Sequence, residues 1–236
     1  MFKVCMRVDL GRKGYQEVWD LQRRLVPLRQ AGDIPDVLLL VEHPPTYTLG
    51  RAAKREHVLV SEGELEQIGA SLIHTDRGGD VTFHGEGQLV GYPIVDLAEM
   101  QPDVHLYLRR LEEVIIQALA RFGVEADRQP GLTGVWHPEG KLAAIGVRVA
   151  RWVTSHGFAL NVSTDLEYFK RIVPCGIVGH QVASMESVLG KPTSLAEVAN
   201  VLSGEFGRVF DRVMLSRSIE RLLRESHVEI WKAAAS

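Results

Sequence analysis

The chain contains little cysteine and no long apolar run. Its two cysteines, Cys5 and Cys175, stand far apart, which gives no basis for a disulfide framework and fits a reducing compartment. No stretch approaches the roughly 20 apolar residues that cross a bilayer. The N-terminal segment turns polar by Asp9, before the apolar core of a signal peptide could form. We therefore expect a cytoplasmic protein without membrane contact.

The chain also lacks an excess of one charge and several ligand-binding motifs. Its 27 Lys and Arg residues against 30 Asp and Glu leave a net charge of −3, so no overall basic field would attract nucleic acid. It has no Cys-x-x-Cys or His-x-x-x-His pair of the kind that zinc sites use. It has no P-loop, and Gly85-Glu86-Gly87 runs into strand-like residues rather than a helix. We expect no metal, no cofactor and no nucleic-acid partner.

The composition and the order of apolar segments predict the fold class. The 236 residues are 45% hydrophobic and 24% charged, enough for one large core, and no linker or repeat divides them. We therefore treat 1–236 as a single domain. Strand-like segments follow one another without an intervening helix at 71–95 and 141–162. This arrangement predicts an α/β (α+β) fold with a mixed, largely antiparallel sheet flanked by helices.

Periodicity and capping residues predict individual elements. The apolar run 37–41 indicates a buried strand. Ser61 and Glu64 have the spacing of a capping box, which begins a short helix. Pro27 should end or kink the helix expected at 13–31. Further helices are expected at 104–122, from Ser194 and from about Ser218.

A glycine-rich segment at 77–88 is the most informative part of the chain. Four glycines fall within ten of its residues: Gly78, Gly79, Gly85 and Gly87. Glycine lets the backbone take a positive φ or approach another group closely. The segment alone fits a mobile turn as well as a loop that lies against a ligand. Arg77, at its start, would either stabilise the fold or bind a carboxylate or phosphate.

Cys175 and Lys141 are candidates for chemistry. Cys175 stands between Pro174 and Gly176, on a turn that could present its thiol. A nucleophilic cysteine needs a neighbour that lowers its pKa from about 8.5 and accepts its proton. Lys141, which begins a strand of small residues, is a candidate for that neighbour. The alternatives are a buried, inert cysteine and a solvated lysine at a strand end.

Several segments, in order and at plausible spacing between 41 and 177, carry a shared pattern. They include Arg77-Gly78-Gly79-Asp80-Val81-Thr82-Phe83-His84, Lys141-Leu142-Ala143-Ala144-Ile145-Gly146, His156-Gly157-Phe158-Ala159 and Val173-Pro174-Cys175-Gly176. Together they resemble the lipoyl(octanoyl) transferases, which move an octanoyl group from acyl carrier protein to lipoyl domains. The resemblance implies the scaffold shared by biotin and lipoate protein ligases.

The resemblance also implies roles for individual residues. Cys175 would be the acyl-thioester nucleophile, and Lys141 would lower its pKa and shuttle protons. The implied substrate-contacting residues are Arg77, Gly78, Gly79, Asp80, Val81, Thr82, Phe83, His84, Ala144, Ile145, Gly146, Gly157, Phe158 and Ala159. Two positions depart from the family's pattern: Glu86 replaces a proline, and Ala183 stands where a threonine is common. Glu86 is expected to loosen the loop and add an acid near the site.

The implied reaction transfers an octanoyl or lipoyl group to a lysine, as the first step of endogenous protein lipoylation. The donor would be octanoyl-acyl carrier protein. The acceptors would be apo-lipoyl domains of 2-oxoacid dehydrogenase E2 subunits and the glycine cleavage H protein, and we expect a monomer. The main alternative is an ATP-dependent lipoate or biotin protein ligase. A cysteine hydrolase with a Cys175–His84 pair, or a non-catalytic binding module, would also fit parts of the pattern.

Overall fold

The computed structural model describes residues 3–173 and 181–225. The strands are β1 (Val4–Arg12), β2 (Asp36–Glu42), β3 (Thr46–Leu49), β4 (Ser71–His74), β5 (Val81–His84), β6 (Gln88–Ile94), β7 (Val135–His137), β8 (Gly140–Ala150), β9 (Val153–Asn161) and β10 (Val213–Ser216). The helices are α1 (Tyr15–Ala31), α2 (Glu62–Gln67), α3 (Val104–Ala120), α4 (Met185–Leu189), α5 (Leu195–Phe210) and α6 (Ile219–Glu225). Short 3₁₀ segments lie at Arg55–His57, Leu97–Glu99 and Leu166–Arg171.

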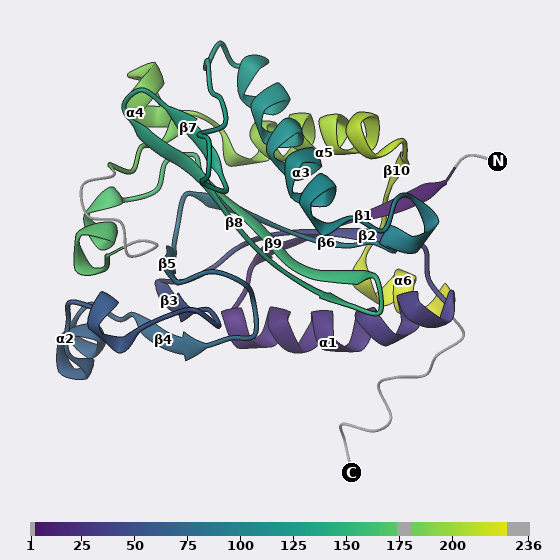
Figure 1. The fold of residues 1–236 in the computed structure, drawn as a ribbon, viewed down its shortest axis with the longest axis horizontal. Coiled ribbons are helices and arrows are strands. Elements are labelled where there is room, and N and C mark those ends of the chain that lie inside the picture. Colours follow the sequence, from purple (N-terminus) through teal and green to yellow (C-terminus); the bar gives the residue numbers. More distant parts are fainter. Residues whose placement is uncertain (1–2, 174–180, 226–236) are drawn as a thin grey trace.

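Within the described residues, seven strands form a sheet in the order β10-β1-β2-β6-β9-β8-β7. β1 pairs in parallel with β10 and β2, and every other neighbouring pair in this sheet is antiparallel. Helices α3 and α5 cover one face, and α1 and α6 cover the other (Figure 1). The expected mixed, largely antiparallel sheet flanked by helices is therefore confirmed.

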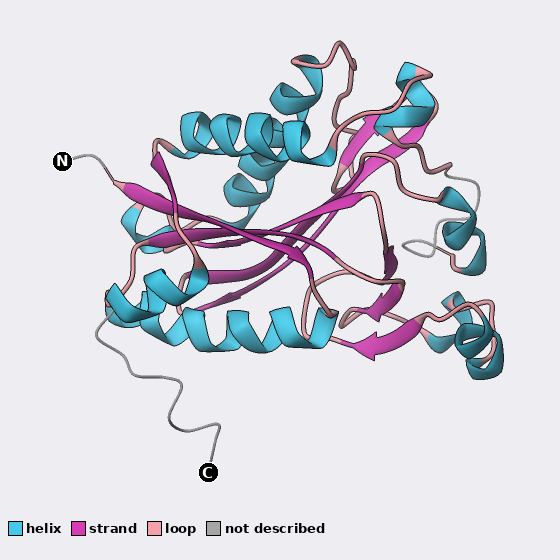
Figure 2. Cartoon of the chain, turned by 180° about the vertical axis from the view of Figure 1, so that it is seen from behind, coloured by secondary structure: helices cyan, strands magenta, loops and turns pink. Residues whose placement is uncertain are grey.

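A second, smaller sheet has the order β4-β3-β5. It lies next to the beginning of α1, at one end of the molecule (Figure 2). A small core of its own, including Tyr47, Leu49 and Phe83, packs between it and α2. The loop from β4 to β5 carries the first part of the glycine-rich segment, Arg77 to Asp80, so this small sheet positions that loop against the large one.

The helix signals of the sequence are confirmed in detail. Ser61 and Glu64 form both bonds of the capping box at the start of α2, and Ser194 caps α5. Pro27, however, lies inside α1, and the helix continues to Ala31 instead of ending there. A proline in the last turn costs a main-chain hydrogen bond. Burial of the neighbouring Leu25 and Leu28 offsets that cost.

The apolar surfaces of the helices account for the layered arrangement. Along α3, Leu111, Val114 and Ile115 are fully buried, and they share a core with Leu202 and Phe206 of α5. These positions repeat at the spacing of one helical face. Among the described residues, no helix is both long enough and apolar enough to pass through a membrane.

Candidate active site

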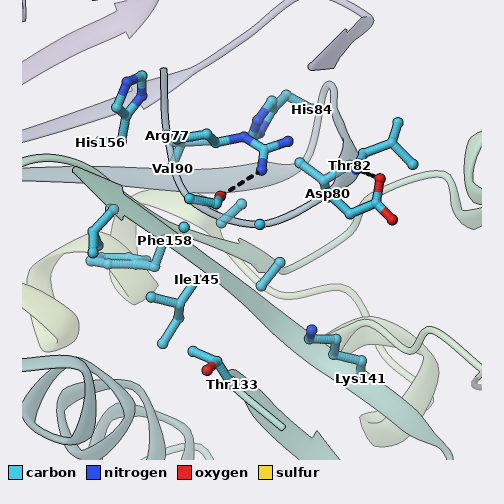
Figure 3. A pocket seen from close by; sticks show the side chains of 18 of the residues that line it. Arg77, Asp80, Thr82, His84, Val90, Thr133, Lys141, Ile145, His156 and Phe158 are labelled. Carbon is cyan, nitrogen blue, oxygen red and sulfur yellow. Dashed lines mark hydrogen bonds between the residues drawn. The ribbon is translucent and has the colours of Figure 1, made fainter. Parts of the chain in front are cut away.

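A pocket of about 520 Å³ lies where the glycine-rich loop crosses the large sheet (Figure 3). Strands β8 and β9 form its floor, and residues 131–133 line one end. Figure 3 places Lys141 and His156 on opposite sides of the view, with Ile145 and Phe158 between them. The pocket therefore joins a lysine at one end, through an apolar middle, to a histidine at the other.

Small residues on β8 and β9 make room for the pocket. Ala144 pairs with Ala159, and Gly146 pairs with Gly157 across the two strands. A Cβ atom at position 146 would lie 2.9 Å from the carbonyl oxygen of Gly78. Only glycine at this position lets the loop approach the strand so closely.

Main-chain and side-chain bonds hold the loop in place. The Gly78 N–H donates to the Val147 carbonyl oxygen at 2.9 Å. The buried Arg77 guanidinium donates to the Thr48 carbonyl oxygen at 2.6 Å, to its hydroxyl, and to the Gly78 carbonyl oxygen at 3.0 Å. Arg77 thus stabilises the fold, which is one of the two roles that the sequence left open, while its side chain also lines the pocket.

The pocket is lined by Lys141 and by every substrate-contacting residue expected from the sequence except Phe83. Phe83 stacks on Tyr168 instead, with ring centroids 4.5 Å apart, because its two neighbours in β5 point to the opposite side of the strand. Glu86 does not line the pocket and forms an exposed ion pair with Arg12. The expectation of an added acid near the site is therefore not met by the geometry.

Lys141 is held by main-chain bonds on both sides. Its N–H donates to the Gln181 carbonyl oxygen at 2.9 Å, and its carbonyl oxygen accepts from the Ala183 N–H at 3.1 Å. The Nζ atom lies 5.0 Å from the ring centroid of Trp136, a geometry that favours an ammonium group. Cys175 lies outside the described residues, so its approach to Lys141 stays a prediction.

His84 is poorly suited to serve as the base of a cysteine hydrolase. Its Nδ1 lies 2.9 Å from Gln88 Oε1, and its Nε2 lies 3.3 Å from the Thr48 hydroxyl. Burial lowers the pKa of His84 well below its ordinary value. Both ring nitrogens are therefore occupied by partners that fix the ring.

Polar side chains at the histidine end of the pocket form a network that no sequence motif indicated. The Nε2 atom of His156 lies 2.7 Å from a carboxylate oxygen of Asp76, and its Nδ1 atom lies 3.4 Å from the Tyr15 hydroxyl oxygen. His43 Nε2 lies 2.8 Å from the Tyr92 hydroxyl. These residues come from α1, β6, β9 and two loops distant in sequence, so no local pattern joins them. Within the described ranges, no cluster of three or more His, Cys, Asp or Glu is placed to hold a metal ion.

The protonation of His43 should make stability depend on pH. Its Nδ1 donates to the Lys13 carbonyl oxygen, and burial lowers the pKa of His43 from 6.5 to about 4. Between these values the unfolded chain binds the proton and the folded chain does not. The stabilisation is complete above pH 6.5 and is lost as the pH falls toward 4, by up to about 3 kcal/mol.

Urea unfolding at pH 7.5 and at pH 4.5 measures this loss. His84 and His156, whose pKa values are also lowered by burial, add to it with the same sign. A His43→Gln variant should lose less stability than the unchanged chain between the two pH values. An equal loss in both proteins would show that His43 is not buried in its neutral form.

Comparisons with known proteins agree with this geometry. Residues 14–207 match the family model described as the lipoyl protein ligase A/B catalytic domain. The chain is 50% identical over 222 residues to an octanoyltransferase of Koribacter versatilis, covering 92% of this chain and 88% of the relative. It is 51% identical over 215 residues to an octanoyltransferase of Solibacter usitatus, covering 91% of this chain and 96% of the relative.

A solved structure shows the same fold at low identity. The bipartite lipoate protein ligase of Thermoplasma acidophilum, solved in a study that included its E2 lipoyl domain, superposes with a TM-score of 0.75 at 19% identity. The match covers 98% of this chain and 96% of that chain, which confirms the expected lipoate protein ligase-like scaffold. Because these two octanoyltransferases are half identical to it along nearly their whole length, the chain belongs to the octanoyltransferases of the lipoyl protein ligase A/B family and is an acyltransferase.

Proposed function

We propose that residues 1–236 form a single catalytic domain that transfers an octanoyl group from octanoyl-acyl carrier protein to a lysine of apo-lipoyl domains. The acceptors are the lipoyl domains of 2-oxoacid dehydrogenase E2 subunits and the glycine cleavage H protein. One observation carries the proposal: Lys141 lines an apolar pocket whose walls include Ile145 and Phe158. An amine beside an acyl-sized slot is what acyl transfer between a thiol and a lysine requires.

The first step loads the enzyme. The Lys141 ammonium group favours the thiolate of Cys175, since an adjacent cation lowers the pKa of a thiol. The thiolate attacks the carbonyl carbon of the donor thioester, and the bond from that carbon to the pantetheine sulfur breaks. The departing sulfur takes a proton from Lys141, which leaves octanoyl-Cys175 and a neutral lysine.

The second step transfers the acyl group. The neutral amine of the acceptor lysine attacks the enzyme thioester, an amide bond forms, and the bond to the Cys175 sulfur breaks. Lys141, now neutral, takes the proton from the attacking nitrogen and regains its charge. The donor is already a thioester, so the cycle needs no adenylate.

The oxyanion formed in each step needs hydrogen-bond donors. The Gly78 N–H is engaged by Val147 and is unsuited to this role. The N–H groups of Gly79 and Gly176 are the remaining candidates from the sequence. Gly79 lines the pocket, whereas Gly176 lies outside the described residues.

The slot should determine the length of the transferred acyl chain. Ala144 lies on the same face of β8 as Gly146, which faces the loop, because side chains alternate along a strand. In Ala144→Leu, the added carbons should displace two or three methylenes of an octanoyl chain. At about 0.8 kcal/mol per methylene, octanoyl transfer should fall about tenfold or more while butanoyl transfer is retained.

Rates with butanoyl- and octanoyl-acyl carrier protein give the ratio that checks this prediction. Ala31→Leu, at an exposed position near the end of α1, is the matched control and should keep the original ratio. An unchanged ratio in Ala144→Leu would place the acyl chain elsewhere.

An assay without ATP tests the proposed reaction. The purified chain is mixed with octanoyl-acyl carrier protein and an apo-lipoyl domain, and the mass of the lipoyl domain is followed. We expect the gain of one octanoyl amide without ATP. Modification only with octanoic acid and ATP would support a ligase, and release of free octanoate without modification would support a hydrolase.

A further inference from the structure

The main chain at Gly134 packs directly against the side chain of Lys141. Gly134 precedes β7 and has a φ of 130°, which L-amino acids with side chains rarely adopt. A Cβ atom there would lie 2.6 Å from both the Ala143 carbonyl oxygen and Lys141 Cε, and 3.3 Å from Lys141 Nζ. The backbone at position 134 therefore forms one wall of the space that holds the Lys141 amine.

A buried carboxylate on α3 holds Gly134 in place. The Gly134 N–H donates to Glu112 Oε1 at 3.1 Å. The other oxygen, Oε2, accepts from Arg109 Nη1 at 2.7 Å and from Arg128 Nε at 3.1 Å. The Glu112 side chain is 0% exposed, and both of its oxygens have partners. These contacts connect α3, through one main-chain N–H, to the position of Lys141.

The same short segment contacts the amine a second time. Two residues after Gly134, the Trp136 ring has its centroid 5.0 Å from Lys141 Nζ. The Trp136 main chain is fixed to Asp127 by two hydrogen bonds of 2.8 Å. Residues 134–136 thus contact Lys141 at both Cε and Nζ, and a shift of this segment would move the amine.

A comparable carboxylate elsewhere in the chain lacks this connection. Glu205 of α5 is also buried and is also paired with two arginines, Arg121 and Arg208. Removing either carboxylate takes a buried counter-charge away from its two arginines and should lower stability. Only Glu112 of the two gives an oxygen to the main chain that packs on Lys141. The two glutamates therefore form a matched pair for experiment.

We propose that Glu112 is a positioning residue that fixes the Lys141 amine through Gly134, an inference that rests on the proposed function because Lys141 is its acid–base group. Without the Glu112 carboxylate, the Gly134 N–H loses its partner and the wall beside Lys141 can move. A displacement of about 1 Å in a reacting group can cost about 10²-fold in rate.

Glu112→Ala and Glu205→Ala test the proposal side by side. Both should lower the melting temperature to a similar extent. Glu112→Ala should slow the single-turnover loading of octanoyl from octanoyl-acyl carrier protein by about 10²-fold, with KM for the donor unchanged. Glu205→Ala should change this rate by less than about twofold, as expected of an independent site. Equal losses in both variants would overturn the proposal.

Two further comparisons guard against a purely structural effect. In a Lys141→Ala background, adding Glu112→Ala should change the residual loading rate by less than about twofold. The same large loss in that background would show that Glu112 acts elsewhere. Gly134→Ala should slow loading in the Lys141-containing chain but not further in the Lys141→Ala background, whereas Gly123→Ala, at another positive-φ glycine with open space around it, should not slow loading in either. Equal effects of the two glycine variants would also overturn the proposal.

A readout without turnover separates this proposal from the proposed function. The rate at which an amine-modifying isothiocyanate labels Lys141 is followed by peptide mass in the same variants. If the unchanged chain is never loaded with octanoyl, the proposed function is wrong. The labelling rate of Lys141 then tests the positioning role of Glu112 independently of that function. Faster labelling in Glu112→Ala than in Glu205→Ala supports it, and equal labelling contradicts it.

Discussion

Replacing Lys141 with methionine is expected to reduce octanoyl transfer by about 10²–10⁴-fold, the usual contribution of a general acid–base group. Methionine keeps an unbranched apolar chain in the pocket but removes the amine that lines it. Under the proposed mechanism, the Cys175 thiol would lose the cation that lowers its pKa, and both the departing thiol and the attacking amine would lose their proton partner. The single-turnover rate of octanoyl loading measures the loss in the first step, and the steady-state rate of transfer to the lipoyl domain shows whether the second step is slowed as well.

Two control variants make this result specific. Lys141→Arg keeps a cation that does not deprotonate, so it should load Cys175 faster than the methionine variant yet stay slow in transfer to the acceptor lysine. Lys170→Met removes an exposed lysine that pairs with Glu167 and should leave both rates unchanged. A fully active Lys141→Met would remove Lys141 from the mechanism.

Asp36→Asn is expected to lower the free energy of unfolding by about 3–5 kcal/mol, the usual cost of breaking a buried ion pair. Asp36 of β2 is 2% exposed, and its two oxygens accept from Arg29 Nε at 2.8 Å and from Arg212 Nε at 2.7 Å. Its Oδ1 also accepts from the Asp96 N–H at 3.2 Å. The neutral amide would leave two buried guanidinium groups without their shared counter-charge.

Urea unfolding at pH 7.5 measures this loss. Asp20→Asn is the matched control, because Asp20 forms an exposed pair with Arg23 and such pairs contribute about 0–1 kcal/mol. A loss in Asp36→Asn no larger than that of the control would show that the buried cluster does not join α1, β2 and the start of β10.

The long helices and strands were predictable from the sequence because their apolar residues repeat over enough positions to show a period. Residues 104–122 were expected to form a helix, and α3 spans Val104–Ala120. Strands β3, β7 and β10 were not predicted, since three or four residues show no clear alternation. Pro27 does not end α1, because the tertiary packing of that helix outweighs the local penalty that the sequence alone suggests.

The candidate site was predictable only where its residues follow one another in the chain. The loop from Arg77 and the strand from Lys141 stand out as motifs, and the fold brings both to one pocket. Tyr15, which lines the same pocket, comes from an ordinary helix face. Glu112 is likewise one polar residue among the buried positions of α3, and its bond to Gly134 follows only from the packing of helix on loop.

The intact-protein mass shows whether Cys175 carries the octanoyl group as a thioester, as we propose. The purified chain and its Cys175→Ser variant are each mixed with octanoyl-acyl carrier protein in the absence of ATP. We predict a gain of one octanoyl group that hydroxylamine removes and that the serine variant does not show. An unmodified chain that forms octanoyl-adenylate once octanoic acid and ATP are supplied would contradict the account and identify a ligase.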